Sequence, residues 1–252
     1  MRTPLIAANW KMNTTLADAH VLANGVKQRI EHLENIEVLL CPPTIWLTEM
    51  AHIVPLHHLK HLKLGAQNIY YPDSGAFTGE TSPVMVKELA EYVLVGHSER
   101  THVFKESLDL TALKLSSAIK HGLKPILCIG EDERNEESKR QLVHKLNHLI
   151  KELSPEELDT LTVAYEPVWA ISGGNAAHQA ADPEYADVIL TALRSVLPDS
   201  VRLLYGGSAN NENCRGFLEL DHCDGLLIGG ASLKLPVFVE MCHIAEDLAK
   251  TS

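Results

Sequence analysis

Short, continuously apolar segments recur along the chain. Eight of them stand out: LIAAN from Leu5, VLLC from Val38, LKLGAQ from Leu62, YVLVG from Tyr92, PILCIG from Pro125, LTVAYE from Leu161, RLLYGG from Arg202 and GLLIGG from Gly225. Successive segments begin between 23 residues (Arg202 to Gly225) and 41 residues (Leu161 to Arg202) apart. Apolar runs without polar alternation predict parallel strands that are buried on both faces.

The stretches between these segments carry the signals of helices. Thr15 and Asp18 form a capping-box pattern. Ser82-Pro83 and Asp182-Pro183 each join an N-cap residue to a proline at the first helical position. After the capping box, helical spacing is kept by Leu22, Val26, Ile30 and Leu33. In RQLVHKLNHLIKEL the same spacing places on one face Leu142, Leu146, Leu149 and Leu153.

Eight strand–helix units in 252 residues are typical of one closed (β/α)8 barrel. A doubly wound open sheet is the competing architecture, and it usually carries a glycine-rich turn after its first strand. Here the first apolar segment leads into NWKMN, which has no glycine. No low-complexity linker or shift in composition marks a boundary, so we expect a single barrel domain over residues 1–252.

Composition narrows the class of partner. Hydrophobic residues make up 45% of the chain and charged residues 22%, the balance of a globular protein. The formal net charge of −11 argues against binding to nucleic acid or to an anionic membrane, because both need a positive face. A small anionic substrate is still compatible with this charge, since backbone N–H groups and one lysine can hold a phosphate.

Cysteine usage and the first residues bear on the cellular compartment. The five cysteines are odd in number and form no C-x-x-C pattern, so we expect free, mostly buried thiols in a reducing compartment. Only a short apolar patch precedes Asn9, and no run reaches the roughly 18–20 apolar residues of a membrane span. These features predict a cytoplasmic protein without a signal peptide.

Chemically useful side chains follow three of the predicted strands. The first segment ends in Asn9 and is followed by Lys11, the fourth is followed by His97, and the sixth ends in Glu166. Active residues of parallel barrels lie at the carboxyl ends of the strands. We therefore expect a carboxylate, an imidazole and an ammonium group to meet at one end of the barrel.

Each of these side chains also has a common structural role. A glutamate is most often a surface acid, and a lone histidine is most often structural. Glu166, however, follows a buried run directly and precedes Pro167, which restricts its backbone, and partial desolvation strengthens a carboxylate as a base. A short helix should begin after His97, and a helix N-terminus favours the neutral imidazole. With Lys11 as a cation for a developing oxyanion, the set meets the needs of proton abstraction next to a carbonyl.

Two glycine turns follow the last two predicted strands, at Gly206-Gly207-Ser208 and Gly229-Gly230. Either one alone could serve only a tight turn. The loops after strands seven and eight of a barrel, however, commonly bind phosphate through N–H groups and a helix dipole. Their joint position predicts a phosphate site beside the proton-transfer residues.

Seven motifs in the chain resemble those of the triosephosphate isomerase family. In order, they are AANWKMN, GAQN with GAFTGE, VLVGHSER, PILCIGE, AYEPVWAI, YGGS and DGLLIGGASL. The resemblance extends from Leu5 to about Leu233. It implies interconversion of dihydroxyacetone phosphate and glyceraldehyde 3-phosphate, with neither a cofactor nor a bound metal.

The resemblance also implies the roles of individual residues. Glu166 would carry a proton between substrate carbons 1 and 2, and His97 would polarise or protonate the substrate oxygens. Lys11 and Asn9 would stabilise the charge on oxygen. The supporting positions behind them would be Ser98 and Glu99. The backbone N–H groups that meet the phosphate would be those of Ser172, Ser208, Gly229 and Gly230.

A lid and a subunit interface follow from the same resemblance. The lid would consist of Pro167, Val168, Trp169, Ala170, Ile171, Ser172, Gly173 and Gly174. Family members act as homodimers in which GAFTGE reaches into the neighbouring subunit, so that Thr78 would approach the partner's active site. The lid departs from the family pattern Ile-Gly-Thr-Gly-Lys, because residues 171–175 read ISGGN. Thr101 also departs from the family, which usually has a second arginine there.

Two further features are interpreted as surface. His57, His58 and His61 have a spacing that could align imidazoles on a helix, but no cysteine or acid lies close in sequence. We expect a solvated helix face rather than a metal site. The charged run GEDERNEESKR, residues 130–140, is expected to form a solvated loop and a first helical turn.

Two alternative functions stay open on the sequence. The altered lid fits an isomerase of a four-carbon ketose phosphate. The barrel could instead be a non-catalytic binder of phosphate, although a pure binder has no use for the base at Glu166.

Overall fold

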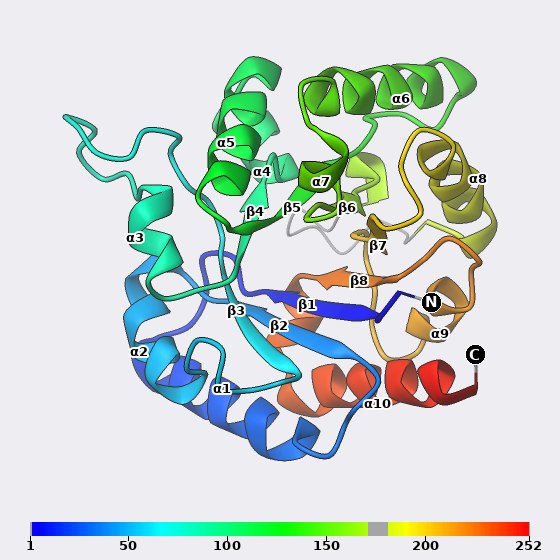
Figure 1. Cartoon of the computed structure of the whole chain (residues 1–252). Helices are drawn as coiled ribbons and strands as arrows, with labels where there is room; N and C mark the ends of the chain where they lie inside the picture. Colours follow the sequence, from blue (N-terminus) through cyan, green and yellow to red (C-terminus); the bar gives the residue numbers. More distant parts are fainter. Residues whose placement is uncertain (1, 171–180, 252) are drawn as a thin grey trace.

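The eight predicted strands form a closed parallel barrel (Figure 1). The structure, a computed structural model, describes residues 2–170 and 181–251, and β1 closes the ring by pairing with β8. The strands are β1 Leu5–Asn9, β2 Glu37–Cys41, β3 Leu62–Ala66, β4 Tyr92–Val95, β5 Lys124–Ile129, β6 Thr162–Tyr165, β7 Arg202–Tyr205 and β8 Gly225–Ile228. Each begins within one residue of its predicted start, so the prediction of a (β/α)8 barrel is confirmed.

Helices surround the strands (Figure 1). They are α1 Leu16–Ile30, α2 Leu47–Ile53, α3 Pro83–Lys87, α4 Ser98–His102, α5 Leu108–Lys120, α6 Glu136–Ile150, α7 Pro155–Leu158, α8 Pro183–Arg194, α9 Cys214–Leu218 and α10 Leu235–Thr251. Short 3-10 turns are η1 Thr44–Trp46, η2 Val168–Ala170 and η3 Gly230–Leu233. The predicted caps are confirmed: Thr15 and Asp18 complete a capping box on α1, and Ser82 and Asp182 cap α3 and α8.

Strand alternation divides the apolar residues into two cores. On β1, Leu5 and Ala7 belong to a cluster made only of strand residues, whereas Ile6 and Ala8 belong to a larger cluster that includes helix residues. Successive side chains of a strand point to opposite faces, so the first cluster fills the barrel and the second joins it to the helices. Both cores fix the strand ends, where the polar residues lie.

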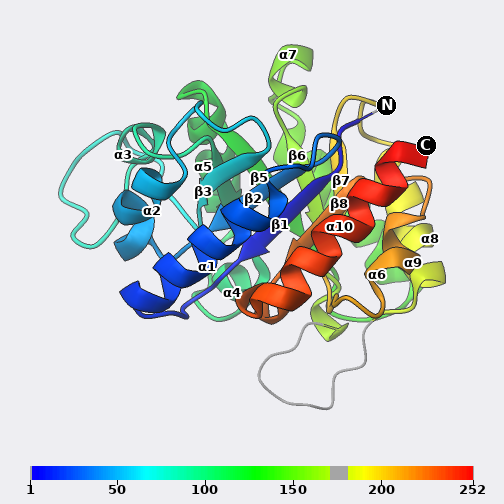
Figure 2. The same cartoon turned by 90° about the horizontal axis from the view of Figure 1, so that it is seen from below.

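The two ends of the barrel are easily followed in Figure 2. The N-terminus and α7 lie at the top of this view and α4 lies at the bottom. Because α7 precedes β6 and α4 follows β4, the carboxyl ends of the strands face the bottom. All five cysteines lie in the described ranges and are buried free thiols, as expected. No helix in those ranges is long and apolar enough to cross a membrane.

The expectation of a histidine-bearing helix was wrong. Helix α2 ends at Ile53, and His57 has a positive φ of 62°, which ends any helical course. His57 instead lies 3.6 Å from Glu91, and His61 Nδ1 donates to the Ile36 carbonyl at 3.2 Å. Within the described ranges no group of three or more His, Cys, Asp or Glu side chains could hold a metal ion. Leu153 also falls beyond the end of α6, although it still packs against the core.

Candidate active site

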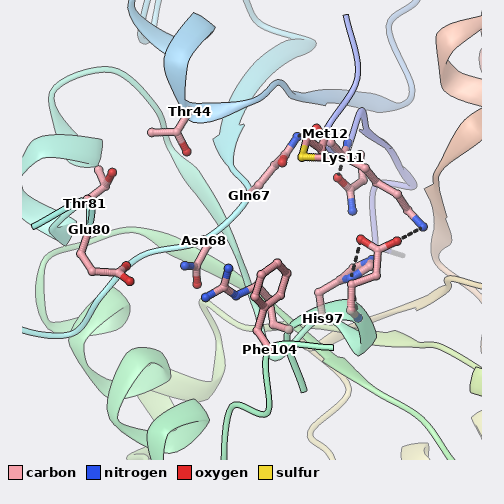
Figure 3. Close-up of a pocket in the computed structure, with 13 residues that line it drawn as sticks. Lys11, Met12, Thr44, Gln67, Asn68, Glu80, Thr81, His97 and Phe104 are labelled. Atoms are coloured by element: carbon pink, nitrogen blue, oxygen red, sulfur yellow. Dashed lines mark hydrogen bonds and ion pairs between the residues drawn. The ribbon is translucent and has the colours of Figure 1, made fainter. Parts of the chain in front are cut away.

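Three strand ends bring polar side chains together at the carboxyl end of the barrel. Asn9 is the last residue of β1, His97 follows β4 after Gly96, and Glu166 follows β6 directly. All three are buried, and Glu166 is only 2% exposed. Asn9, Lys11 and His97 line a cavity of about 340 Å³, in which Lys11 and His97 lie on the same side (Figure 3). The meeting of these side chains is the arrangement that the strand pattern predicted.

His97 is held as a neutral donor by the helix that follows it. The residue is the N-cap of α4, and its Nδ1 accepts the backbone N–H of Glu99 at 3.2 Å. An imidazole nitrogen that accepts carries no proton, so the proton sits on Nε2. That Nε2 lies 3.1 Å from Oε1 of Glu166. A ring that carries its proton on Nε2 can donate a hydrogen bond to a substrate oxygen.

The Glu166 carboxylate uses both oxygens within the protein. Oε1 meets His97, and Oε2 accepts the backbone N–H of Ser98 at 2.8 Å, at the first residue of α4. The positive end of a helix stabilises an anion there. Both oxygens of the carboxylate therefore have partners within the chain.

Lys11 has an unusual backbone that directs its ammonium group. Its φ is +53°, a left-handed conformation that costs a non-glycine residue about 1–3 kcal/mol. Asn9 Oδ1 accepts the Lys11 N–H at 3.0 Å, and Gln67 Nε2 donates to the Lys11 carbonyl at 2.9 Å. The Nζ atom then lies 2.8 Å from Oε1 of Glu99 (Figure 3). The strained backbone and its compensating bonds thus hold the Lys11 ammonium group beside Glu99, at the edge of the cavity.

Two glycines, Gly130 and Gly206, pack closely against Glu166, and the sequence analysis did not predict these contacts. A Cβ at Gly130 would lie 1.6 Å from the Glu166 carbonyl oxygen, which no side chain can do. A Cβ at Gly206 would lie 3.0 Å from Glu166 Cγ. Both close approaches join strands that are neighbours in the barrel but distant in sequence. The only sequence signal for them is that each glycine lies at the end of a predicted strand.

The predicted base of the lid rests on a buried carboxylate, which corrects one expectation. Glu131 lies in the charged run 130–140, yet it is only 5% exposed. Its Oε1 accepts the hydroxyl of Tyr165 at 2.6 Å and Nε1–H of Trp169 at 2.9 Å. Burial raises the pKa of Glu131. Residues 132–137 of the run are exposed as expected, and Glu131 is the exception because aromatic side chains from β6 and η2 cover it.

The two glycine turns lie side by side because β7 pairs with β8. A Cβ at Gly229 would lie 3.2 Å from Lys11 Cε, and Gly230 begins the short helix η3. Ser208 Oγ donates to the carbonyl of Ala170 at 2.8 Å, so the first turn contacts the predicted lid base. The predicted lid residues Ile171, Ser172, Gly173 and Gly174 lie outside the described residues.

The remaining predicted positions lie around the cavity. Ser98 and Glu99 contact Glu166 and Lys11 as given above. Thr101 follows on α4, where its Oγ1 donates to the Ser98 carbonyl at 3.2 Å. Thr78 is exposed in the long loop between β3 and α3, which extends away from the barrel at the left of Figure 1.

A closed barrel with a buried carboxylate, a neutral imidazole and a fixed ammonium at its carboxyl end defines a class, that of barrel enzymes that move protons next to a carbonyl. Known proteins give the particular family. The family model described as triosephosphate isomerase matches residues 4–245.

Individual relatives agree with the family model. The chain is 42% identical to triosephosphate isomerase of Dehalococcoides mccartyi over 97% of both chains. It is 38% identical to that of Caldanaerobacter subterraneus over 99% of this chain and 98% of the relative, and 37% identical to that of Natranaerobius thermophilus over 97% of both. The chain belongs to the triosephosphate isomerase family, whose members are aldose–ketose isomerases.

Proposed function

We propose that the chain interconverts dihydroxyacetone phosphate and glyceraldehyde 3-phosphate through an enediolate, using its own side chains and no cofactor. The observation that carries the proposal is the 3.1 Å contact between His97 Nε2 and the Glu166 carboxylate, beside the cavity that Lys11 lines. Family membership supports the substrate and the reaction. This reaction is a step of glycolysis and of gluconeogenesis.

The proposed steps balance as a proton transfer. Glu166 takes a proton from carbon 1 of dihydroxyacetone phosphate, and the electron pair of that C–H bond forms the carbon–carbon double bond of an enediolate. The carbonyl oxygen gains the negative charge, which Nζ of Lys11, the Asn9 amide and Nε2–H of His97 stabilise. Glu166 returns the proton to carbon 2, while His97 transfers a proton between the two oxygens, and the aldehyde results.

The phosphate of the substrate is proposed to bind at the ends of β7 and β8. The backbone N–H groups of Ser208, Gly229 and Gly230 are its expected donors, together with Ser172 of the lid. A dianion there would anchor the substrate so that its carbons reach Glu166. Closure of residues 167–174 would exclude water and protect the enediolate from loss of phosphate.

A homodimer is proposed from the cavity and the loop that bears Thr78. The outer side of the cavity opens beside apolar side chains that are exposed in the single chain, Met12 at 96% and Phe104 at 63%. The loop of Thr78 and Phe77 projects away from its own barrel, as Figure 1 shows. An exposed apolar rim and a projecting loop fit one another in a two-fold pair, where Thr78 would enter the cavity of the partner subunit.

We also propose that the protein works in the cytoplasm, on a small phosphorylated sugar, and binds neither nucleic acid nor membrane. Five buried free thiols and a net charge of −11 support this proposal. Fractionation of the source cells followed by immunoblotting would test it, and recovery with the membranes would contradict it.

The direct test is isomerisation of glyceraldehyde 3-phosphate by the purified chain, coupled to a dehydrogenase that consumes the product. Glu166→Gln should lower turnover by at least about a hundredfold, because an amide accepts no proton at neutral pH. Glu133→Gln, at an exposed position of the charged run, is the matched control and should keep full turnover. Comparable turnover of Glu166→Gln and the parent would refute the proposed base.

The same assay separates the alternative substrates. The ratio kcat/KM should be higher for the three-carbon ketose phosphate than for a four-carbon one. A higher value for the four-carbon substrate would reassign the substrate while leaving the proton transfer intact. Binding of triose phosphate without any turnover would instead indicate a non-catalytic phosphate-binding barrel.

A further inference from the structure

A second cavity lies at the opposite end of the barrel from the proton-transfer residues. Its volume is about 660 Å³, against about 340 Å³ for the cavity at the carboxyl end. It is lined by the first residues of five strands: Glu37 of β2, Tyr92 of β4, Lys124 of β5, Thr162 of β6 and Arg202 of β7. In Figure 2 this end faces the top of the view, on the side of the N-terminus.

Strand alternation explains why charged side chains occupy this mouth. Arg202 lies two positions before Leu204, and Lys124 lies two positions before Ile126, and both apolar residues belong to the cluster inside the barrel. Residues i and i+2 of a strand share a face. Arg202 and Lys124 therefore continue the inward-facing rows and form a polar layer below the apolar interior.

Arg202 keeps hydrogen-bonding capacity that the protein does not use. Its Nη2 donates to the hydroxyl of Tyr92 at 2.8 Å, and its Nη1 lies 3.4 Å from Oε1 of Glu37. The Tyr92 hydroxyl in turn donates to Glu37. A guanidinium has five N–H groups, so three of them have no acceptor among the described residues. The side chain is only 17% exposed, which makes this a largely buried cation with free donors.

The charges around the mouth favour an anion. Four cationic side chains line it, from Arg2, Lys60, Lys124 and Arg202, against three acids, from Glu34, Glu37 and Asp159. Two of the acids are engaged, Glu37 by Arg202 and Tyr92, and Asp159 by the Ser200 hydroxyl at 2.6 Å. Two of the cations are also paired, Arg2 with Asp224 at 2.7 Å and Lys124 with Glu91 at 3.3 Å. Lys60 makes no ion pair with any described residue. The lining therefore carries one positive formal charge in excess, on a chain with a net charge of −11.

We propose that this N-terminal mouth binds a small, multiply charged oxyanion, of the class that includes polyphosphates and tricarboxylates. Arg202 and Lys124 would meet it at the floor of the cavity and Lys60 at the rim. A guanidinium with free N–H groups binds phosphate and carboxylate oxygens alike. The proposed ligand is therefore defined by its charged oxygens, whether a phosphate or a carboxylate group carries them. The volume leaves room for an anion larger than a triose phosphate.

Calorimetric titration of the purified protein with sodium pyrophosphate and, separately, with sodium citrate tests the proposal. Binding of either anion is expected at low ionic strength, and the anion that binds more tightly identifies the phosphate or the carboxylate source. Lys60→Glu should weaken binding at least about fivefold, because it reverses a charge at the rim, and Lys124→Gln should weaken it in the same direction. Arg140→Glu makes the same change of charge as Lys60→Glu at an exposed position of α6 and should leave the affinity unchanged.

An active-site variant keeps the two cavities distinguishable. Lys11→Met removes the ammonium from the carboxyl-end cavity, so binding at the N-terminal mouth should survive in it. Binding that is lost in Lys11→Met and unchanged in Lys60→Glu would place the anion in the substrate cavity and overturn the proposal. Absence of binding of both anions to the parent protein would overturn it as well. Because circular dichroism reports folding, each variant is compared at equal folded concentration.

Discussion

At the scale of single residues, the position of Glu166 depends on neighbours that place no side chain against it. Gly130 and Gly206 leave room for the chain on either side of the carboxylate, and Ser98 offers a backbone N–H rather than a side chain. The sequence identifies the carboxylate because it follows a buried run. It does not identify Gly130 or the Ser98 contact, because these partners come from other strands of the barrel.

Gly206→Ala tests this enclosure. Its Cβ would lie 3.0 Å from Glu166 Cγ and 3.2 Å from the Tyr165 carbonyl oxygen, so the carboxylate must shift. A misplacement of about 1 Å can cost a hundredfold in rate, so a shift of a few tenths of an ångström should lower kcat by roughly two- to tenfold. Gly216→Ala on α9, where the nearest contact is Pro183 at 3.3 Å, is the control and should retain kcat in the coupled assay. Equal kcat values for the two variants would show that Gly206 does not position the base.

At the scale of elements, Glu131 joins η2, the first turn of the proposed lid, to the barrel. The carboxylate accepts from Trp169 of η2 and from Tyr165 of β6, so one buried acid connects a rigid strand to the segment that leads into the lid. The charged run 130–140 gave no sign of this burial. A run of acidic residues has no apolar periodicity, and the aromatic side chains that cover Glu131 lie more than thirty residues away.

Trp169→Phe removes the donor while keeping an aromatic ring. One hydrogen bond to a charged group contributes about 1.5–3 kcal/mol, so its loss should change the balance between open and closed lid. We expect kcat and KM to change together by about two- to tenfold in steady-state kinetics. Trp46→Phe makes the same substitution on η1, where the indole donates to the Thr14 carbonyl at 3.4 Å, and should change neither constant. Unchanged kcat and KM in Trp169→Phe would show that the hydrogen bond to Glu131 does not affect opening and closure of the proposed lid.

A buried ion cluster joins α4 to α5 and gives a prediction about pH. Glu106 accepts from Arg100 Nε at 2.7 Å and from Lys114 Nζ at 2.6 Å. Burial alone would raise the pKa of Glu106, but Lys114 and Arg100 outweigh it and leave the pKa lowered. Stability from this carboxylate is therefore fully present above the unfolded-state pKa and is lost as the pH falls through the folded-state value.

Glu106→Gln should consequently cost about 3 kcal/mol in the free energy of unfolding at pH 7. The difference from the parent should shrink as the pH falls below about 4, because protonation then makes the parent resemble the variant. Urea denaturation at several pH values measures it. A gap that stays constant between pH 7 and pH 3 would contradict the linkage.

At the scale of the whole molecule, the proposed homodimer depends on the loop that bears Thr78. Thr78→Arg places a large cation at the tip of that loop and should yield monomers with a much lower kcat, measured by light scattering and the coupled assay. Val188→Arg introduces the same charge on α8, where the side chain is 47% exposed, and should leave the oligomer intact. Dimers of full activity in Thr78→Arg would rule out this loop as the interface.

The sequence by itself determined the barrel and the chemistry at its carboxyl end. Apolar runs, caps and strand-end residues are local signals. A chain with eight strand–helix units buries its apolar strands by closing them into a barrel surrounded by the helices. Only the tertiary structure decided which polar groups are covered and which face a cavity. Three features each join strands or helices far apart in the chain: the burial of Glu131, the hydrogen bond between Glu166 and Ser98, and the polar cavity around Arg202. Closure of the barrel sets these distances.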